Sequence, residues 1–266
     1  MSSVAELTQR AQKAPVISAS TSQAVQHYFD DLVLLGVMPL IAGCGLVYEY
    51  ALSHYAGIIL GNTETAIFIM IGIMIMSAGF GSLMSQRVTN AFAGLVWLEI
   101  AIIVLGSSAV PVIAAAVYIS NNFLLANSAI NSAAPGVEAV VPYLFGFVMG
   151  FLMGMEMPLV ARIREKVRGA EGAKGTAIVY ASDCIGIASG TFVWAAYLGN
   201  IDVISAATLA ASVNAIALSV FILRYRTQFN FQRAITIALV AAFLVLTLVP
   251  TQGAQWFAEL TVSARN

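Results

Sequence analysis

The fold of this chain is restricted most by a series of apolar runs, most of them close to 20 residues long, with short polar segments between them. A helix needs about 20 apolar residues to cross a hydrocarbon core of about 30 Å. Backbone polar groups find no water there, so only helices and closed barrels cross it. The runs are continuous rather than alternating, and charged residues make up only 9% of the 266. The sequence therefore predicts an all-α bundle of membrane-spanning helices.

Seven apolar runs define the expected spans of this multi-pass membrane protein. They are residues 32–60, 65–84, 91–111, 140–161, 176–198, 203–223 and 234–249. Residues 1–31 are polar and lack the apolar core of a signal peptide, so we expect a flexible cytoplasmic tail there. Residues 32–250 then form the transmembrane domain, with a long outer connection at 112–137, and residues 251–266 form a short outer tail.

The basic residues are divided unevenly between the two ends of these spans. Cytoplasmic loops retain Lys and Arg, which sets the orientation of a membrane protein. Of the 12 basic residues, only Arg265 lies on the side opposite to the N-terminus. The others are Arg10, Lys13, Arg87, Arg162, Arg164, Lys166, Arg168, Lys174, Arg224, Arg226 and Arg233. We therefore expect an inner-membrane protein with its N-terminus inside and its C-terminus outside.

Several kinds of site do not fit this sequence. The net charge of −1 and the lack of a basic patch argue against a nucleic-acid partner. The two cysteines form no CxxC pair and have no neighbouring histidines, so we expect no metal site. Phosphate loops and nucleophile arrangements are not recognisable either, and we expect no cofactor. The lipid bilayer is the first partner that the composition predicts.

Four acidic residues fall within the expected spans: Glu49, Glu99, Glu156 and Asp183. An ionised carboxylate near the centre of a bilayer costs about 2.5 to 3.5 kcal/mol. No Lys or Arg lies deep within a span to pair with them. Three states remain open for these acids: they are protonated, they accept hydrogen bonds from neighbouring groups, or they bind a cation that comes from elsewhere. A purely structural role as hydrogen-bonding groups between helices competes with a functional one.

Small residues accompany the acids at helical spacing. Such stripes let helix backbones approach closely, so they predict helix packing. The candidate packing residues are Gly45 beside Glu49, Gly146, Gly150 and Gly154 before Glu156, and Gly186 and Gly190 after Asp183.

Two prolines add backbone acceptors near the acids. Pro39 and Pro158 have no N–H group, so the carbonyls of Leu35 and Gly154 lose their helical donors. Freed carbonyls beside acids suit an intramembrane cation site.

Six sequence motifs, in this order, resemble the N-terminal membrane domain of membrane-bound spermidine synthase-like proteins, which are polyamine aminopropyltransferases. The motifs are CGLVYE at 44–49, GN at 61–62, SAGFGS at 77–82, Glu99, GFLMGMEMPL at 150–159 and YASDCIGIASG at 180–190. The resemblance covers residues 33–223. It implies a functional set within the membrane, for ligand binding or proton relay, made of Tyr48, Glu49, Glu99, Glu156, Tyr180 and Asp183.

In that family the membrane helices precede a cytosolic α/β domain that binds decarboxylated S-adenosylmethionine and putrescine. This chain has only 17 residues after its last expected span, so we expect the catalytic domain to be absent from it. The resemblance therefore favours a chain that is not itself an enzyme.

Three functions are compatible with these observations. The first is a membrane module that binds a small cation, with a polyamine as the first candidate, and acts as a subunit with separate soluble partners. The second is a proton- or cation-coupled transporter of small molecules, in which the acids form a relay. The third is a structural scaffold, whose glycine stripes seat a partner protein or a second copy of the chain.

Overall fold

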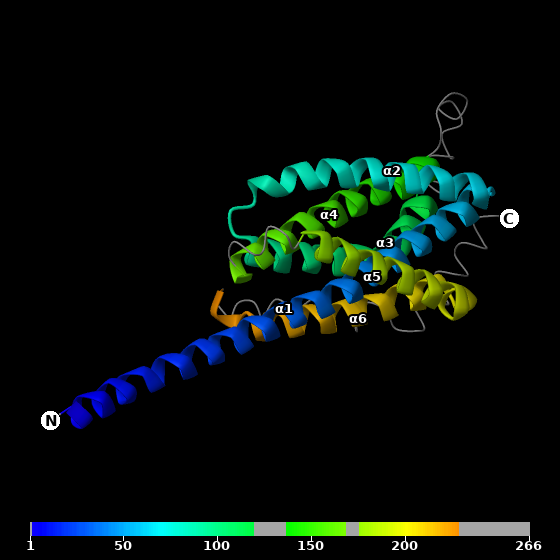
Figure 1. The fold of residues 1–266 in the computed structure, drawn as a ribbon. Helices are drawn as coiled ribbons and strands as arrows, with labels where there is room; N and C mark the ends of the chain where they lie inside the picture. The colour runs from blue at the N-terminus through cyan, green and yellow to red at the C-terminus, as the bar shows by residue number, and fades with distance from the viewer. Residues whose placement is uncertain (1, 120–136, 169–175, 229–266) are drawn as a thin grey trace.

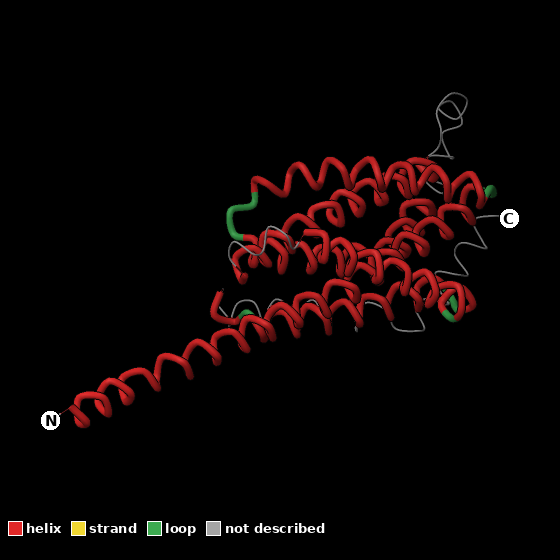
Figure 2. Tube along the Cα trace, in the orientation of Figure 1, coloured by secondary structure: helices red, strands yellow, loops and turns green. Residues whose placement is uncertain are grey.

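The computed structural model describes residues 2–119, 137–168 and 176–228, and this part of the chain is helical without strands (Figure 2). Its long helices are α1 (Ser2–Leu60), α2 (Thr63–Met84), α3 (Ala91–Ile119), α4 (Val137–Arg168), α5 (Thr176–Ala196) and α6 (Val203–Arg224). Single 3₁₀ turns follow three of them: η1 (Ser85–Arg87), η4 (Leu198–Asn200) and η5 (Arg226–Gln228).

Each of the six helices contains a segment long and apolar enough to cross a membrane. Several large apolar side chains on their outer faces are exposed, including Phe68 on α2 and Phe192 on α5 at 74% and 75%. Many exposed apolar side chains of this kind are expected where a protein faces lipid rather than water. The prediction of an all-α fold with membrane-length helices is therefore confirmed, whereas the orientation in the membrane stays a prediction.

Helix α1 runs through the bundle (Figure 1) and contacts each of the other five long helices. Helix α4 also packs against α2 and α3, and α3 packs against α6. Sharp turns join α1 to α2 and α5 to α6: Asn62 caps α2 by accepting from the Thr65 N–H, and Asp202 caps α6 by accepting from the Ser205 N–H. Gly61, with φ of 72°, takes the left-handed turn that ends α1.

Glycines lie at two close helix contacts. Between α2 and α4, a Cβ on Gly150 would lie 2.6 Å from the Met74 carbonyl oxygen, and one on Gly154 would overlap the carbonyl of Ala78. Between α1 and α5, a Cβ on Gly190 would lie 2.6 Å from the Gly43 carbonyl oxygen. Both pairs of helices approach so closely that their backbones are in contact, as small residues permit in membrane helix packing.

The structure changes three of the expected boundaries. Helix α3 continues past Pro111 to Ile119, because a proline removes one hydrogen bond from a helix but neighbouring turns continue it. Helix α4 runs on to Arg168, so Arg162, Arg164, Lys166 and Arg168 are helical rather than in a loop; Arg and Lys favour helix and stabilise its C-terminal end.

Residues 2–31, expected as a flexible tail, continue α1 as helix; the N-terminal end of this helix projects from the bundle (Figure 1), whereas Asp30 and Asp31 contact α6 and α4. Extension of an existing helix needs no new nucleation, and this segment is rich in residues that tolerate helix. The expected seventh span at 234–249, the outer tail at 251–266, and most of the outer connection lie outside the described residues.

Candidate functional site

Three of the four acids expected within the membrane line one cavity. Glu49 of α1, Glu156 of α4 and Asp183 of α5 contribute to its wall, and α2 adds Ala78 and Ser82. Its volume of about 320 Å³ lies within the range of roughly 300 to 1,000 Å³ that is typical of ligand pockets. The remaining lining is mostly apolar: Ala42, Leu46, Met153, Gly154, Met157, Pro158 and Ile187. We call this space the acidic cavity.

Glu156 is the most buried acid of the acidic cavity. It is 5% exposed, and its Oε1 atom has no hydrogen-bond partner among the described residues. Glu49 and Asp183 are half-buried. The described ion pairs all lie at one end of the bundle, and none includes these three acids. The acidic cavity therefore gathers carboxyl groups without a basic side chain to balance them.

The fourth acid, Glu99 of α3, lies in a separate polar cluster between α3, α1 and α6. Its side chain is fully buried, and its Oε2 atom accepts a hydrogen bond of 3.0 Å from Nδ2 of Asn214. The ring of Tyr48 packs against Gly106 of α3, and its hydroxyl lies near Glu99 and Asn214. We call Glu99, Asn214 and Tyr48 the Glu99 cluster.

Glu156 connects the two groups of acids electrostatically. It is close enough to both Glu99 and Asp183 for their charges to interact. Like charges in a medium of low dielectric constant repel strongly, so the protonation state of one of these carboxyl groups affects the others.

Tyr180 is the one residue of the expected set that lies away from both groups. Its side chain is 57% exposed on the outer face of α5, beside Cys184 rather than toward the acidic cavity. Residues 180 and 183 are neighbours on a helix surface, but Asp183 lines the acidic cavity and Tyr180 does not. Tyr48 and Glu49, adjacent on α1, likewise belong to different groups: Tyr48 joins the Glu99 cluster, and Glu49 lines the acidic cavity.

The glycines expected at helix contacts have different neighbours. Gly45 faces the Met153 side chain, where a Cβ would lie 2.6 Å from its terminal methyl group. Gly186 packs against Pro39 of α1, and Gly146 against the Met70 side chain of α2.

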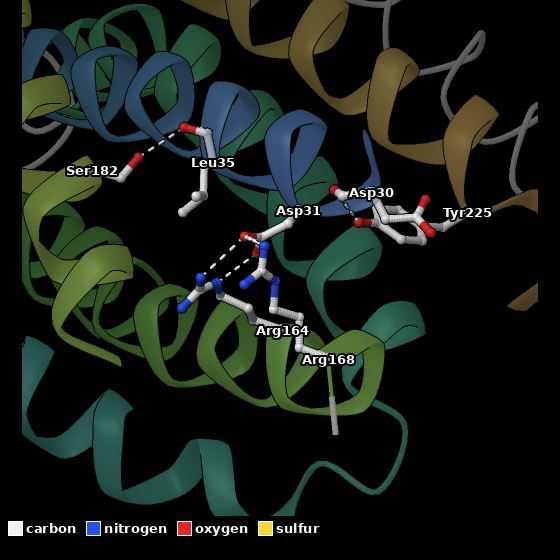
Figure 3. A network of polar contacts seen from close by, with 7 residues as sticks. All are labelled: Asp30, Asp31, Leu35, Arg164, Arg168, Ser182 and Tyr225. Carbon is white, nitrogen blue, oxygen red and sulfur yellow. Dashed lines mark hydrogen bonds and ion pairs between the residues drawn. The ribbon is translucent and has the colours of Figure 1, made fainter. Parts of the chain in front are cut away.

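The structure contains an ion-pair network at one end of the bundle that the sequence did not lead us to expect (Figure 3). Arg164 of α4 donates to Asp31 of α1 through Nε at 2.6 Å and Nη2 at 3.0 Å, and both side chains are buried. Arg168 adds a second contact to Asp31 at 3.0 Å. Asp30 pairs with Arg224 of α6, and the Tyr225 hydroxyl donates to the backbone carbonyl of Asp30 at 2.9 Å. The network joins α1, α4 and α6.

Two sequence signals could have indicated the ion-pair network and the role of Asn214. Asp30 and Asp31 stand next to each other at the start of the first apolar run, on the side where the basic residues gather. Asn214 is a polar residue in the middle of the 203–223 run, where an amide also needs a buried partner.

Known relatives match most of this chain. It is 35% identical over 242 residues to a polyamine aminopropyltransferase of Shewanella oneidensis, a match that covers 86% of this chain and 42% of the relative. It is 29% identical over 229 residues to polyamine aminopropyltransferase 2 of Streptomyces coelicolor, which covers 83% of this chain and 39% of that relative. No family model and no solved structure matches. The homologues of this chain are therefore polyamine aminopropyltransferases, and the chain spans about two fifths of the length of these curated relatives.

Proposed function

We propose that this chain is a membrane module that binds an elongated organic cation, with a polyamine as the first candidate, in the acidic cavity. We further propose that it works as a subunit with soluble protein partners. The observation that carries the proposal is Glu156, whose buried Oε1 atom lacks a partner in the described structure while two more carboxyl groups line the same cavity. A buried carboxylate is costly until it gains a partner, and a bound cation supplies one.

The arrangement of the acids favours an extended cation over a metal ion. Among the residues that the structure describes, no three acidic, histidine or cysteine side chains are placed to hold one metal ion. The three carboxyl groups instead lie on different walls of the acidic cavity, with apolar side chains such as Leu46 and Met157 between them. A polyamine carries ammonium groups separated by methylene chains, so its charges match the carboxylates and its spacers match the apolar lining. The names of the relatives agree with this ligand class.

Thermal unfolding of the detergent-solubilised full chain tests this proposal. Spermidine or putrescine should raise the unfolding temperature, because a ligand that binds only the folded state stabilises it. Glu49→Gln and Asp183→Asn should each remove most of this rise. Glu64→Gln is the matched control, because Glu64 is an exposed acid at the start of α2, outside the acidic cavity.

Two outcomes would contradict the proposal. One is the absence of any rise across several polyamines. The other is an equal rise in the wild type and in the two cavity variants, which would indicate nonspecific binding to surface charge. Variants of the acids that leave both ligand response and assembly unchanged would support a structural scaffold instead.

A proton- or cation-coupled transporter is the second candidate. The observation that favours it is the series Asp183, Glu156 and Glu99, whose charges interact across α5, α4 and α3. Such series of acids carry protons through membrane transporters. Flux of radiolabelled spermidine into proteoliposomes under an imposed pH gradient separates the two candidates. Flux at the level of empty liposomes would exclude transport, and flux that depends on Glu156 would favour it.

A further inference from the structure

The Glu99 cluster contains three buried polar atoms without partners among the described residues: Glu99 Oε1, Asn214 Oδ1 and the Tyr48 hydroxyl oxygen. All three residues are at most 2% exposed. Buried polar atoms are normally paired, so each exception needs an explanation. The hydrogen bond from Asn214 Nδ2 to Glu99 Oε2 accounts for one polar side-chain atom of each residue and leaves Glu99 Oε1 and Asn214 Oδ1 unpaired.

The cluster is short of hydrogen-bond donors. The unpaired oxygen of the Asn214 amide only accepts, and both oxygens of an ionised Glu99 also only accept. The donors are the Tyr48 hydroxyl proton and the two N–H groups of Asn214, one of which is already bonded to Glu99 Oε2, so three donors face four acceptor oxygens. A proton on Glu99 supplies the missing donor and removes a buried negative charge at the same time. A proton on the carboxyl group needs no cavity of its own.

Charged and titratable groups reach Glu99 from the helices packed around it. Helix α1 presents Cys44 and Tyr48, and α4 presents Glu156. Helix α6 presents Asn214, which does not titrate. None of these groups brings a positive charge to Glu99. Glu156 is the one among them that also lines the acidic cavity.

We propose that the Glu99 cluster is a proton-binding site, and that a cation entering the acidic cavity displaces this proton. The inference rests on the proposed function, because it assigns the displacing cation to the acidic cavity. In the exchange, the O–H bond of Glu99 breaks, the proton leaves to water, and the carboxylate remains. Glu156 is the positioning residue that transmits the effect, because its charge interacts with Glu99 on one side and with Asp183 on the other.

The sign of the coupling follows from electrostatics. A positive charge in the acidic cavity stabilises nearby carboxylates, so it weakens the binding of a proton at Glu99. Coupling between two sites is reciprocal, so a proton at Glu99 must weaken cation binding equally. Cation affinity should therefore rise with pH, by up to about tenfold per pH unit for one exchanged proton, and should level off once Glu99 is deprotonated.

Isothermal titration calorimetry of the full chain in detergent, with spermidine, measures this exchange. Titrations in two buffers of different ionisation enthalpy give the number of protons released for each spermidine bound. The wild type should release protons. Glu99→Gln should still bind spermidine but release fewer protons, with a flatter dependence of affinity on pH. Glu64→Gln, which changes an exposed acid outside both the Glu99 cluster and the acidic cavity, should behave as the wild type.

A second measurement does not depend on any variant. Infrared difference spectra of the wild type should show that a carbonyl band of a protonated carboxyl group loses intensity when spermidine binds, and a carboxylate band gains it. An unchanged carboxyl band would overturn the exchange even if Glu99→Gln failed to fold.

The outcomes separate the two proposals. Saturable spermidine binding without proton release, or with equal release in the wild type and Glu99→Gln, would overturn the exchange and leave the acidic cavity as a cation site. A complete lack of spermidine binding would overturn the proposed function and the exchange that rests on it.

Discussion

The Ser182 hydroxyl of α5 donates a hydrogen bond of 2.8 Å to the backbone carbonyl oxygen of Leu35 on α1 (Figure 3). That carbonyl lacks its usual donor because the residue four positions on is Pro39, which has no N–H group. Gly186 packs against Pro39 one turn further along α5. The freed carbonyl that the sequence suggested as a cation ligand thus holds two helices together, one residue away from Asp183.

Loss of the Ser182 hydroxyl should destabilise the contact between α1 and α5. Ser182→Ala leaves the Leu35 carbonyl without a donor, and hydrogen bonds between membrane helices contribute about 0.6 kcal/mol on average, with about 1.7 kcal/mol as the upper limit. Reversible unfolding in mixed detergent micelles measures the change. Thr191→Ala is the control, because the Thr191 hydroxyl bonds only to Ile187 within its own helix.

Pro39→Ala tests the cause of this interaction. It restores a backbone donor for the Leu35 carbonyl, so Ser182→Ala should cost less in that background than in the wild type. Equal costs in the two backgrounds would contradict the role of the proline.

A methyl group at Gly81 should separate α2 from α4. Its Cβ would overlap the Phe151 carbonyl of α4, and overpacking of this kind costs about 1 to 3 kcal/mol. Gly79, two residues earlier on α2, has no atom within 4 Å of an added Cβ. Gly79→Ala should therefore be neutral or stabilising, since Ala favours helix by about 1 kcal/mol over Gly. Unfolding temperatures that rank the two variants in the opposite order would refute this packing.

Asp31→Asn should destabilise the bundle more than Asp30→Asn. It leaves the buried Arg164 guanidinium without a charged partner, and breaking a buried ion pair costs about 3 to 5 kcal/mol. The Asp30–Arg224 pair is more exposed, so its loss should cost no more than about 1 kcal/mol. Size-exclusion profiles and unfolding temperatures of both variants check this order, and similar losses would argue against a special role of Arg164.

Asn214→Leu should be rescued by a second substitution at Glu99. The single change removes the one hydrogen bond to Glu99 and leaves its carboxyl group buried without a partner, at a cost of about 1 to 3 kcal/mol. In Asn214→Leu with Glu99→Met, both polar groups are gone and the loss should largely disappear. Additive losses in the double variant would mean that the two side chains do not interact. Asn200→Ala, at an exposed position outside the cluster, is the control for the single change.

The position and type of the helices follow from local features of the sequence. The length of the apolar runs and the small number of charges predict the six long helices of the described structure. A segment that crosses a membrane must satisfy its own backbone hydrogen bonds, and a helix does so without a partner. The ends are less determined. Helix α3 continues past Pro111, and α4 continues through Arg162 to Arg168. The added turns of α4 are stabilised by contacts of Arg164 with Asp31 and of Arg162 with the carbonyls of Ser85 and Val88.

The grouping of the acids is a property of the tertiary structure. The sequence by itself determined that Glu49, Glu99, Glu156 and Asp183 lie within apolar helices and are costly there. It could not determine which of them meet, because that depends on how each helix is rotated and how far it slides along its neighbours. Close backbone packing at the glycines sets both quantities, and it directs Glu49, Glu156 and Asp183 to one cavity and Glu99 to Asn214.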